Sequence, residues 1–144
     1  MIYNQKTKNF YIQQQLEWNP DADPQVIGFI ANFVWHKVHN QDEYEMLRAL
    51  FMDGYCYYFA HMLQQAFQRG EVCICAPFGH FVWMDDDIPY DIEGVSTSEA
   101  EYYIPEHYLG ETVQDFLQIP NIVHRTTEDE IQQIMDDYKN DNNI

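Results

Sequence analysis

The spacing of the hydrophobic residues changes at Gly70, and this change constrains the fold more than any other feature of the chain. Before it, four apolar residues recur at a spacing that places them on one helical face: Cys56, Ala60, Leu63 and Phe67. After it, residues 72–76 form a short apolar run typical of a strand, and further strands are predicted at 80–84 and 88–92. We therefore predict an α+β fold, with helices first and an antiparallel meander after Gly70.

Start signals predict two more helices in the N-terminal half. Asp23 followed by Pro24 is typical of a helix N-terminus, because Asp caps free N–H groups and proline suits the first helical position. Asn40 with Glu43 resembles a capping box. Residues 1–22 are polar and rich in Gln and Asn, and we predict an N-terminal arm that is either extended or a short strand.

The remainder of the chain carries weaker patterns. We expect short helical turns within 99–117, a helix opened by the capping box of Thr127 and Glu130, and a frayed tail at 140–144. The 144 residues contain no internal repeat and no linker-like stretch. We therefore predict a single domain over 1–144.

The charge balance excludes several classes of partner. Twenty-four Asp and Glu against seven Lys and Arg give a net charge of −17. Free nucleic acid and anionic membrane surfaces both require clustered Lys and Arg, so we expect neither as a partner. The chain has no apolar run long enough to span a bilayer and no secretory signal at its N-terminus, so we expect a cytoplasmic protein whose cysteines are thiols.

Cys56 is the candidate nucleophile. It falls in the first turn of a predicted helix, where free N–H groups and the helix dipole favour a thiolate and can bind an oxyanion. The alternative is a small apolar core residue. Cys73 and Cys75 share one face of a predicted strand, and we interpret them as buried thiols, with a zinc pair as the alternative.

His80 and Asp91 are the candidate base and its orienting group. A nucleophilic thiol needs an imidazole as base and acid, and the imidazole needs a third group to hold its tautomer. If the hairpin turns on Asp85-Asp86, His80 lies directly opposite Asp91. That register puts Pro89 where a ladder N–H is expected, which a bulge near the turn would relieve. The alternative for the pair is a structural His–Asp hydrogen bond.

The order of these motifs resembles the papain-like superfamily, most closely its transglutaminase-like and bacterial or phage members. The resemblance covers residues 50–96, and three segments carry it: 54–63, 79–83 and 90–95. It implies a papain-like fold, with the Cys on a helix N-terminus packed on a small antiparallel sheet. It also implies a cysteine hydrolase or acyltransferase in which Cys56 attacks, His80 is base and acid, and Asp91 orients His80.

The oxyanion donor departs from this pattern. Papain-like enzymes carry a Gln shortly before the Cys, and none lies there in this chain. Gln41 is the nearest upstream, and the backbone N–H of Cys56 or Tyr57 is the alternative. The aromatic residue that follows the nucleophile in the family matches as Tyr57.

We expect no cofactor and no bound metal. His36 and His39 have a spacing that suits two metal ligands, but a solvated helix end, where His⁺ complements the dipole, is the favoured interpretation. Asp85-Asp86-Asp87 is interpreted as a solvated turn rather than a cation site.

Two functions follow as hypotheses. The first is a thiol-dependent hydrolase or acyltransferase that acts on an amide or ester bond of a peptide, a protein or a small amide, and the acidity favours a basic substrate. The second is an acidic, non-enzymatic binding protein or inhibitor on a papain-like scaffold, for which imitation of nucleic acid is one way of acting. The sequence leaves the substrate and the oligomeric state open.

Overall fold

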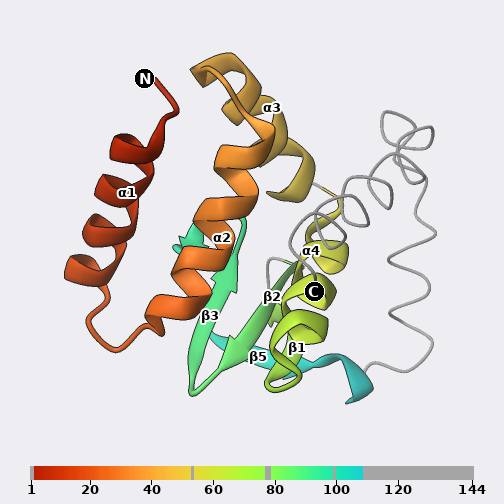
Figure 1. The fold of residues 1–144 in the computed structure, drawn as a ribbon. Coiled ribbons are helices and arrows are strands. Elements are labelled where there is room, and N and C mark those ends of the chain that lie inside the picture. The colour runs from red at the N-terminus through yellow and green to blue at the C-terminus, as the bar shows by residue number, and fades with distance from the viewer. Residues whose placement is uncertain (1, 53, 77–78, 99, 109–144) are drawn as a thin grey trace.

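A computed structural model describes residues 2–52, 54–76, 79–98 and 100–108. The predicted helix opened by Thr127 and the predicted tail at 140–144 lie outside the described residues. Figure 1 shows the order of the elements along the chain, in which four helices precede the sheet. Within the described residues, no helix has the length and apolar character needed to cross a membrane.

Apart from the first, the four helices begin and end largely where local signals predict. They are α1 (Gln5–Trp18), α2 (Pro24–Lys37), α3 (Gln41–Met52) and α4 (Cys56–Phe67). Asp23 caps α2 through the N–H of Gln25, and Asn40 accepts from the N–H of Glu43 at the start of α3. These caps satisfy free backbone donors, which is why the predicted starts hold. The C-cap of α4 is Gln68 in the left-handed conformation, two residues before the predicted stop at Gly70.

Helix α1 contradicts the prediction of an extended arm or strand. Asn4 and Thr7 form a capping box that starts the helix, but none of its residues is fully buried. Only partly buried side chains, among them Tyr11, Ile12 and Leu16, pack against the core. Because the helix is polar on most of its surface, its sequence lacks the apolar stripe from which helices are recognised.

The sheet is antiparallel throughout and has the strand order β4-β3-β2-β1-β5. Its strands are β1 (Glu71–Ala76), β2 (His80–Asp85), β3 (Ile88–Asp91), β4 (Gly94–Val95) and β5 (Tyr102–Pro105). The α+β class and the meander from β1 to β3 are therefore confirmed. One of the short helical turns predicted within 99–117 is present as the 3₁₀ turn Glu106–Tyr108, but the strand β5 before it, which pairs with β1, was not predicted. Residues 99 and 109–117 lie outside the described residues.

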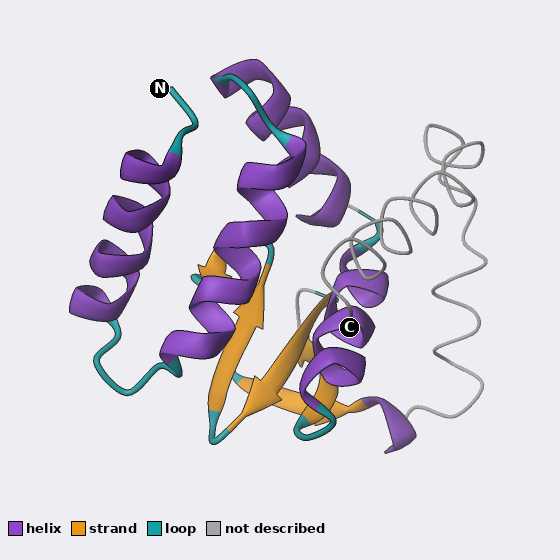
Figure 2. Ribbon diagram, in the orientation of Figure 1, coloured by secondary structure: helices purple, strands orange, loops and turns teal. Residues whose placement is uncertain are grey.

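The main core lies between the helices and one face of the sheet. Figure 2 shows α2 and α4 in front of the strands. The side chains of Val72, Ile74, Phe81, Trp83 and Tyr90 face these helices. The alternate residues Cys73, Cys75 and Val82 form a second, smaller apolar cluster on the opposite face. This alternation follows from the period of two in a strand.

Candidate active site

The β2–β3 hairpin sets the position of the histidine, and its turn differs from the one predicted. Trp83 pairs with Tyr90 and Asp85 pairs with Ile88, so the two-residue turn is Asp86-Asp87 rather than Asp85-Asp86. Both turn residues have positive φ, 51° and 64°, as a type I′ hairpin requires. The predicted pairing is therefore displaced by two residues along the strand.

A displacement of two residues keeps every side chain on the face predicted for it, because side chains alternate with a period of two. His80 therefore meets Asp91 diagonally rather than directly across the hairpin. Pro89 pairs with Met84, one residue beyond the pair that closes the turn, where no hydrogen bond crosses between β2 and β3. Pro89 therefore needs no bulge in the turn, and its carbonyl accepts from the N–H of Ser96 on the other side.

His80 and Asp91 form a buried pair. The Nε2 atom of His80 lies 3.0 Å from Oδ2 of Asp91, and the two residues are 8% and 3% exposed. The other carboxylate oxygen, Oδ1, accepts from the backbone N–H of Glu93 at 2.8 Å. Both oxygens of Asp91 are thus held, one by the imidazole and one by the turn that follows β3 (Ile92 and Glu93).

Cys56 is the first residue of α4, and its sulfur lies beside the unpaired end of β2. The backbone N–H of Phe81 donates to Sγ of Cys56 at 3.3 Å. The paired residues of β2 and β3 end at Trp83 and Tyr90, so the Phe81 N–H, two residues earlier, points past the end of that ladder. The sulfur accepts the hydrogen bond that a longer β3 would otherwise take.

The imidazole of His80 connects the carboxylate to the thiol. Burial lowers the pKa of His80, but interactions of its ring with Asp91 and Cys56 outweigh burial and raise that pKa to about 9. Nδ1 is buried and has no hydrogen-bond partner among the described residues. Because Nε2 faces Asp91, Nδ1 is the nitrogen left for the thiol of Cys56. The structure thus brings the three predicted residues together.

The other two cysteines have a different environment. All three cysteines are free thiols, and Cys73 and Cys75 lie on the sheet face that points away from α2 and α4. His80 shares this face, because it pairs directly with Cys75 across β1 and β2. Burial, together with the nearby carboxylates of Glu71 and Glu106, raises the pKa of Cys73 to about 11. Burial, Asp91 and the two other cysteines raise the pKa of Cys75 to about 12. Both are therefore thiols near neutral pH, in which state they are poor nucleophiles.

Gln41 does not join the site. It opens α3, and its side chain accepts from Tyr3 and donates to Glu45. Because α3 runs away from that end for about 16 Å at 1.5 Å per residue before the chain reaches Cys56, the helix itself separates the two. With its side chain bonded to Tyr3 and Glu45, Gln41 receives no support from the structure as the oxyanion donor. Tyr57 does lie beside the nucleophile, with its ring edge-on to Phe81 at 5.1 Å between centroids.

Sequence reasoning missed a polar cluster next to Tyr57. His61 lies one turn further along α4, and its Nε2 is 2.8 Å from a carboxylate oxygen of Glu106. Burial and the contact with Glu106 raise the pKa of Tyr57 to about 12, so its hydroxyl stays protonated. The spacing of Tyr57 and His61 on one helix was a usable signal, but Glu106 enters only through the pairing of β5 with β1.

The other sites weighed from sequence carry no comparable chemistry. His39 is exposed and contacts Glu43 at 3.0 Å. Within the described ranges, no three His, Cys, Asp or Glu side chains are grouped so that they could hold a metal ion.

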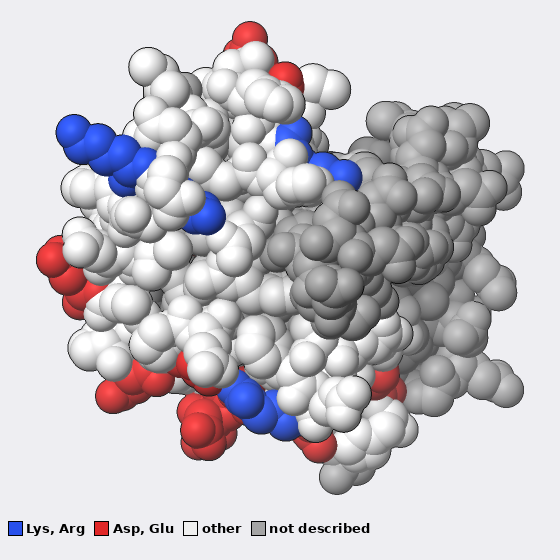
Figure 3. All heavy atoms as spheres, in the orientation of Figure 1, with Lys and Arg blue, Asp and Glu red and all other residues white. Residues whose placement is uncertain are grey.

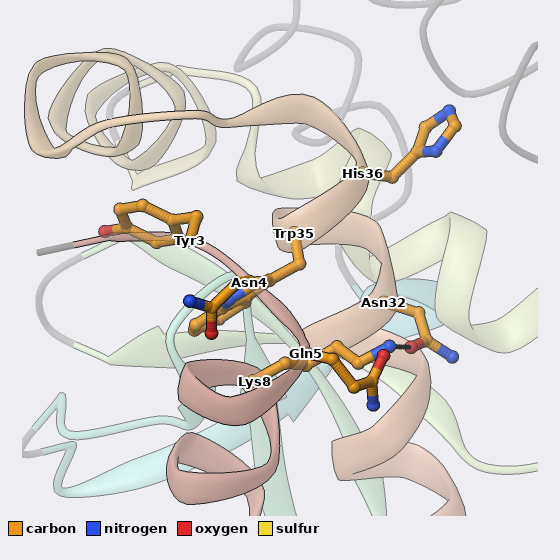
Figure 4. Close-up of a pocket in the computed structure, with 7 residues that line it drawn as sticks. All are labelled: Tyr3, Asn4, Gln5, Lys8, Asn32, Trp35 and His36. Atoms are coloured by element: carbon orange, nitrogen blue, oxygen red, sulfur yellow. Dashed lines mark hydrogen bonds between the residues drawn. The ribbon is translucent and has the colours of Figure 1, made fainter.

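A polar cavity of about 400 Å³ lies between α1 and α2, and it contains none of the three site residues. Figure 4 shows its lining, including the hydrogen bond from Lys8 to Asn32. The side chains of Asn4 and Gln5 are also engaged, with Thr7 and Asn9. A ligand there would have to break existing hydrogen bonds, so we assign this cavity no role.

Comparison with known proteins gives one finding. The family model described as Phage YunG-like protein matches residues 32–140, which is most of the chain and includes Cys56, His80 and Asp91. No curated protein and no solved structure matches the chain. The papain-like or transglutaminase-like assignment is therefore wrong as a family, because the matched family is a different one. The combination of Cys, His and Asp is required by the chemistry of a thiol nucleophile and recurs on unrelated folds, so it does not identify a family.

Proposed function

The chain belongs to the Phage YunG-like protein family, and we propose that it is a thiol-dependent hydrolase or acyltransferase acting on an amide or ester bond. The observation that supports this most strongly is the buried His80–Asp91 pair beside the thiol of Cys56. A buried histidine and aspartate cost free energy to desolvate, and their contact with a thiol at a helix N-terminus is the arrangement that nucleophilic catalysis requires.

The proposed reaction has two halves, and His80 acts as base and then as acid in each of them. His80 takes the proton of the Cys56 thiol, and the sulfur attacks the carbonyl carbon of the substrate to form a tetrahedral intermediate. His80 then gives that proton to the leaving amine or alcohol, which leaves an acyl group on the sulfur. In the second half His80 deprotonates water, or an acceptor amine or alcohol, which attacks the acyl carbon. The C–S bond then breaks, and His80 returns the proton to the sulfur of Cys56. Asp91 holds the His80 ring and stabilises its cationic form throughout.

The oxyanion would be stabilised at the start of α4. The cap residue Tyr55 makes no side-chain hydrogen bond to the helix, so no cap side chain covers its first N–H groups. The backbone N–H groups of Cys56 and Tyr57 are therefore the proposed donors, with the positive end of the helix dipole behind them. They replace the side-chain amide that Gln41 does not supply.

A chromogenic ester tests the proposal without knowledge of the natural substrate. Mixing the protein with excess p-nitrophenyl acetate should release a burst of one nitrophenolate per chain, and intact-mass and peptide analysis should find the acetyl group on Cys56. Cys56→Ala should abolish the burst. Cys73→Ala is the matched control and should keep it, because Cys73 pairs with Val82 rather than with His80, and burial and nearby carboxylates raise the pKa of its thiol to about 11. An acetyl group spread over all three cysteines, or no burst at all, would contradict the proposal.

The second candidate is an acidic binding protein or inhibitor, and the net charge of −17 is the observation that favours it. Figure 3 shows acidic side chains along the lower edge of the molecule, near the end of the β2–β3 hairpin, where Asp21, Asp23, Asp85 and Asp86 line a cavity of about 280 Å³. Arg69 neutralises part of this region through Asp23 and Asp85. A protein acting this way would keep its function in the Cys56→Ala variant, whereas the enzyme would not.

A further inference from the structure

We propose that helix α1 positions Asp91, and that Tyr11 and Gln15 do so by holding the turn that follows β3. The turn is Ile92 and Glu93, between β3 and β4. The consequence for catalysis rests on the proposed function, while the effect on His80 and Asp91 does not. Tyr11 and Gln15 are positioning residues in this proposal, since neither touches the thiol or the imidazole in the contacts described above.

Gln15 pairs with the edge of the sheet as a strand would. Its side-chain oxygen accepts from the N–H of Val95 at 3.1 Å, and its side-chain N–H group donates to the carbonyl of Glu93 at 3.3 Å. These two backbone groups belong to Val95 in the edge strand β4 and to Glu93, the residue just before that strand. One amide therefore satisfies a donor and an acceptor that would otherwise be exposed at the sheet edge.

Tyr11 donates a second hydrogen bond to the carbonyl of Glu93. Its hydroxyl donates to the carbonyl oxygen of Glu93 at 2.6 Å. Burial, together with Tyr44, Asp91 and Glu93, raises the pKa of Tyr11 well above its ordinary value, so the hydroxyl remains a donor at every pH of interest. Glu93 thus receives two hydrogen bonds from α1 on one oxygen.

Gly94 shows how closely α1 approaches this turn. It has a φ of +106°, and a Cβ at this position would lie 2.6 Å from both the Gln15 side-chain oxygen and the Tyr11 hydroxyl. Such contacts are shorter than any that a methyl group tolerates, so only glycine permits both the backbone conformation and the two hydrogen bonds.

Glu93 transmits this constraint to Asp91. Its carbonyl is bound by α1, while its N–H donates to Oδ1 of Asp91 at 2.8 Å. Its carboxylate also forms an ion pair with Arg48 of α3. The backbone of Glu93 is therefore held from both sides. Because its N–H fixes Oδ1 of Asp91, the carboxylate keeps the orientation in which Oδ2 faces His80.

Helix α1 lies before the stretch that the family model matches, which begins at residue 32. The three site residues lie inside that stretch. The structure therefore has a matched segment that supplies the reacting groups and a preceding helix that holds one of them in place.

The test compares Tyr11→Phe/Gln15→Met with the wild type. Tyr11→Phe removes one hydroxyl, and Gln15→Met keeps the length of the side chain without its amide. The first readout is the pKa of His80, followed by NMR titration of its ring. A looser Asp91 should lower that pKa from about 9 by about one unit, a tenfold change in the protonation equilibrium. The single variant Tyr11→Phe should give a smaller shift, and it covers the case in which the double variant does not fold.

Gln14→Met is the matched control, because it makes the same change one residue away, where the structure gives the side chain no hydrogen bond to the turn. It should leave the pKa of His80 unchanged. The second readout is the rate of Cys56 alkylation at pH 7, which should fall in the double variant and stay unchanged in Gln14→Met. An unchanged His80 pKa in a folded double variant would overturn the inference. If wild-type Cys56 fails to react but the His80 pKa still shifts, the proposed function fails and the positioning role stands.

Discussion

The backbone N–H of Phe81 donates to the sulfur of Cys56 at 3.3 Å, at the point where β2 extends beyond the end of β3. The sulfur therefore takes the place of a strand partner at the edge of the sheet. This contact brings the start of α4 to the same strand end that carries His80. The position of the thiol relative to the imidazole thus depends on the length of β3, which is four residues.

Asp91→Asn separates catalysis from packing. The Asn oxygen can still accept from the Glu93 N–H, but its amide cannot stabilise a cationic imidazole. We expect Cys56 alkylation near pH 7 to slow by about tenfold or more, as the pKa of His80 falls towards its ordinary value. Stability should change by only about 1 to 3 kcal/mol for one altered buried hydrogen bond. Lower stability with unchanged Cys56 reactivity would assign Asp91 a structural role alone.

His80 should make stability depend on pH in the alkaline range. Its pKa is about 9 in the folded protein and about 6.5 in the unfolded chain, so the folded state binds the proton more tightly. The stabilisation is complete below about pH 6.5 and is lost as the pH rises through 9, by about 3 kcal/mol at most. Urea unfolding at pH 6.5 and 9.5 measures the loss, and His80→Gln should reduce it. Equal pH dependence in the two proteins would rule out this linkage.

The three cysteines should differ sharply in reactivity. Iodoacetamide at pH 8 should label Cys56 in the folded protein and leave Cys73 and Cys75 unmodified, because their pKa values of about 11 and 12 and their burial keep them as protected thiols. Mass spectrometry of peptides after a time course provides the rates. In urea all three should react at similar rates, which controls for differences between the peptides. Labelling of Cys73 or Cys75 first would contradict the structure of this sheet face.

Gly94→Ala should destabilise the fold through α1. The new methyl group would press against Gln15 and Tyr11, and alanine is strained at a φ of +106°. We expect a loss of about 2 to 4 kcal/mol in the free energy of unfolding. Gly79→Ala is the matched control, because Gly79 also has a positive φ, 77°, while no heavy atom of the described structure lies within 4 Å of its Cβ position. Equal losses in the two variants would show that strain alone, and not contact with α1, sets the cost.

Much of the helical half and the strand meander was predictable because its signals are local. Asp23-Pro24 and Asn40 fix helix starts by capping free N–H groups within a few residues, and the change of period at Gly70 marks the passage from helix to sheet. The alternation of side chains also made the shared face of His80 and Asp91 predictable, even though the assumed turn was displaced by two residues.

Long-range contacts decided the rest. The capping box of α1 is visible in the sequence, but the partners that hold this polar helix, Glu93 and Val95, lie about eighty residues away. The thiol meets Phe81 and His80 only because β3 ends early, and Gln41 is excluded only because α3 carries it to the far end of a helix. The sequence by itself determined which residues could cap, alternate and react, since these properties belong to short stretches of chain. The tertiary structure decided which of them meet, because that depends on strand register and helix packing between distant segments.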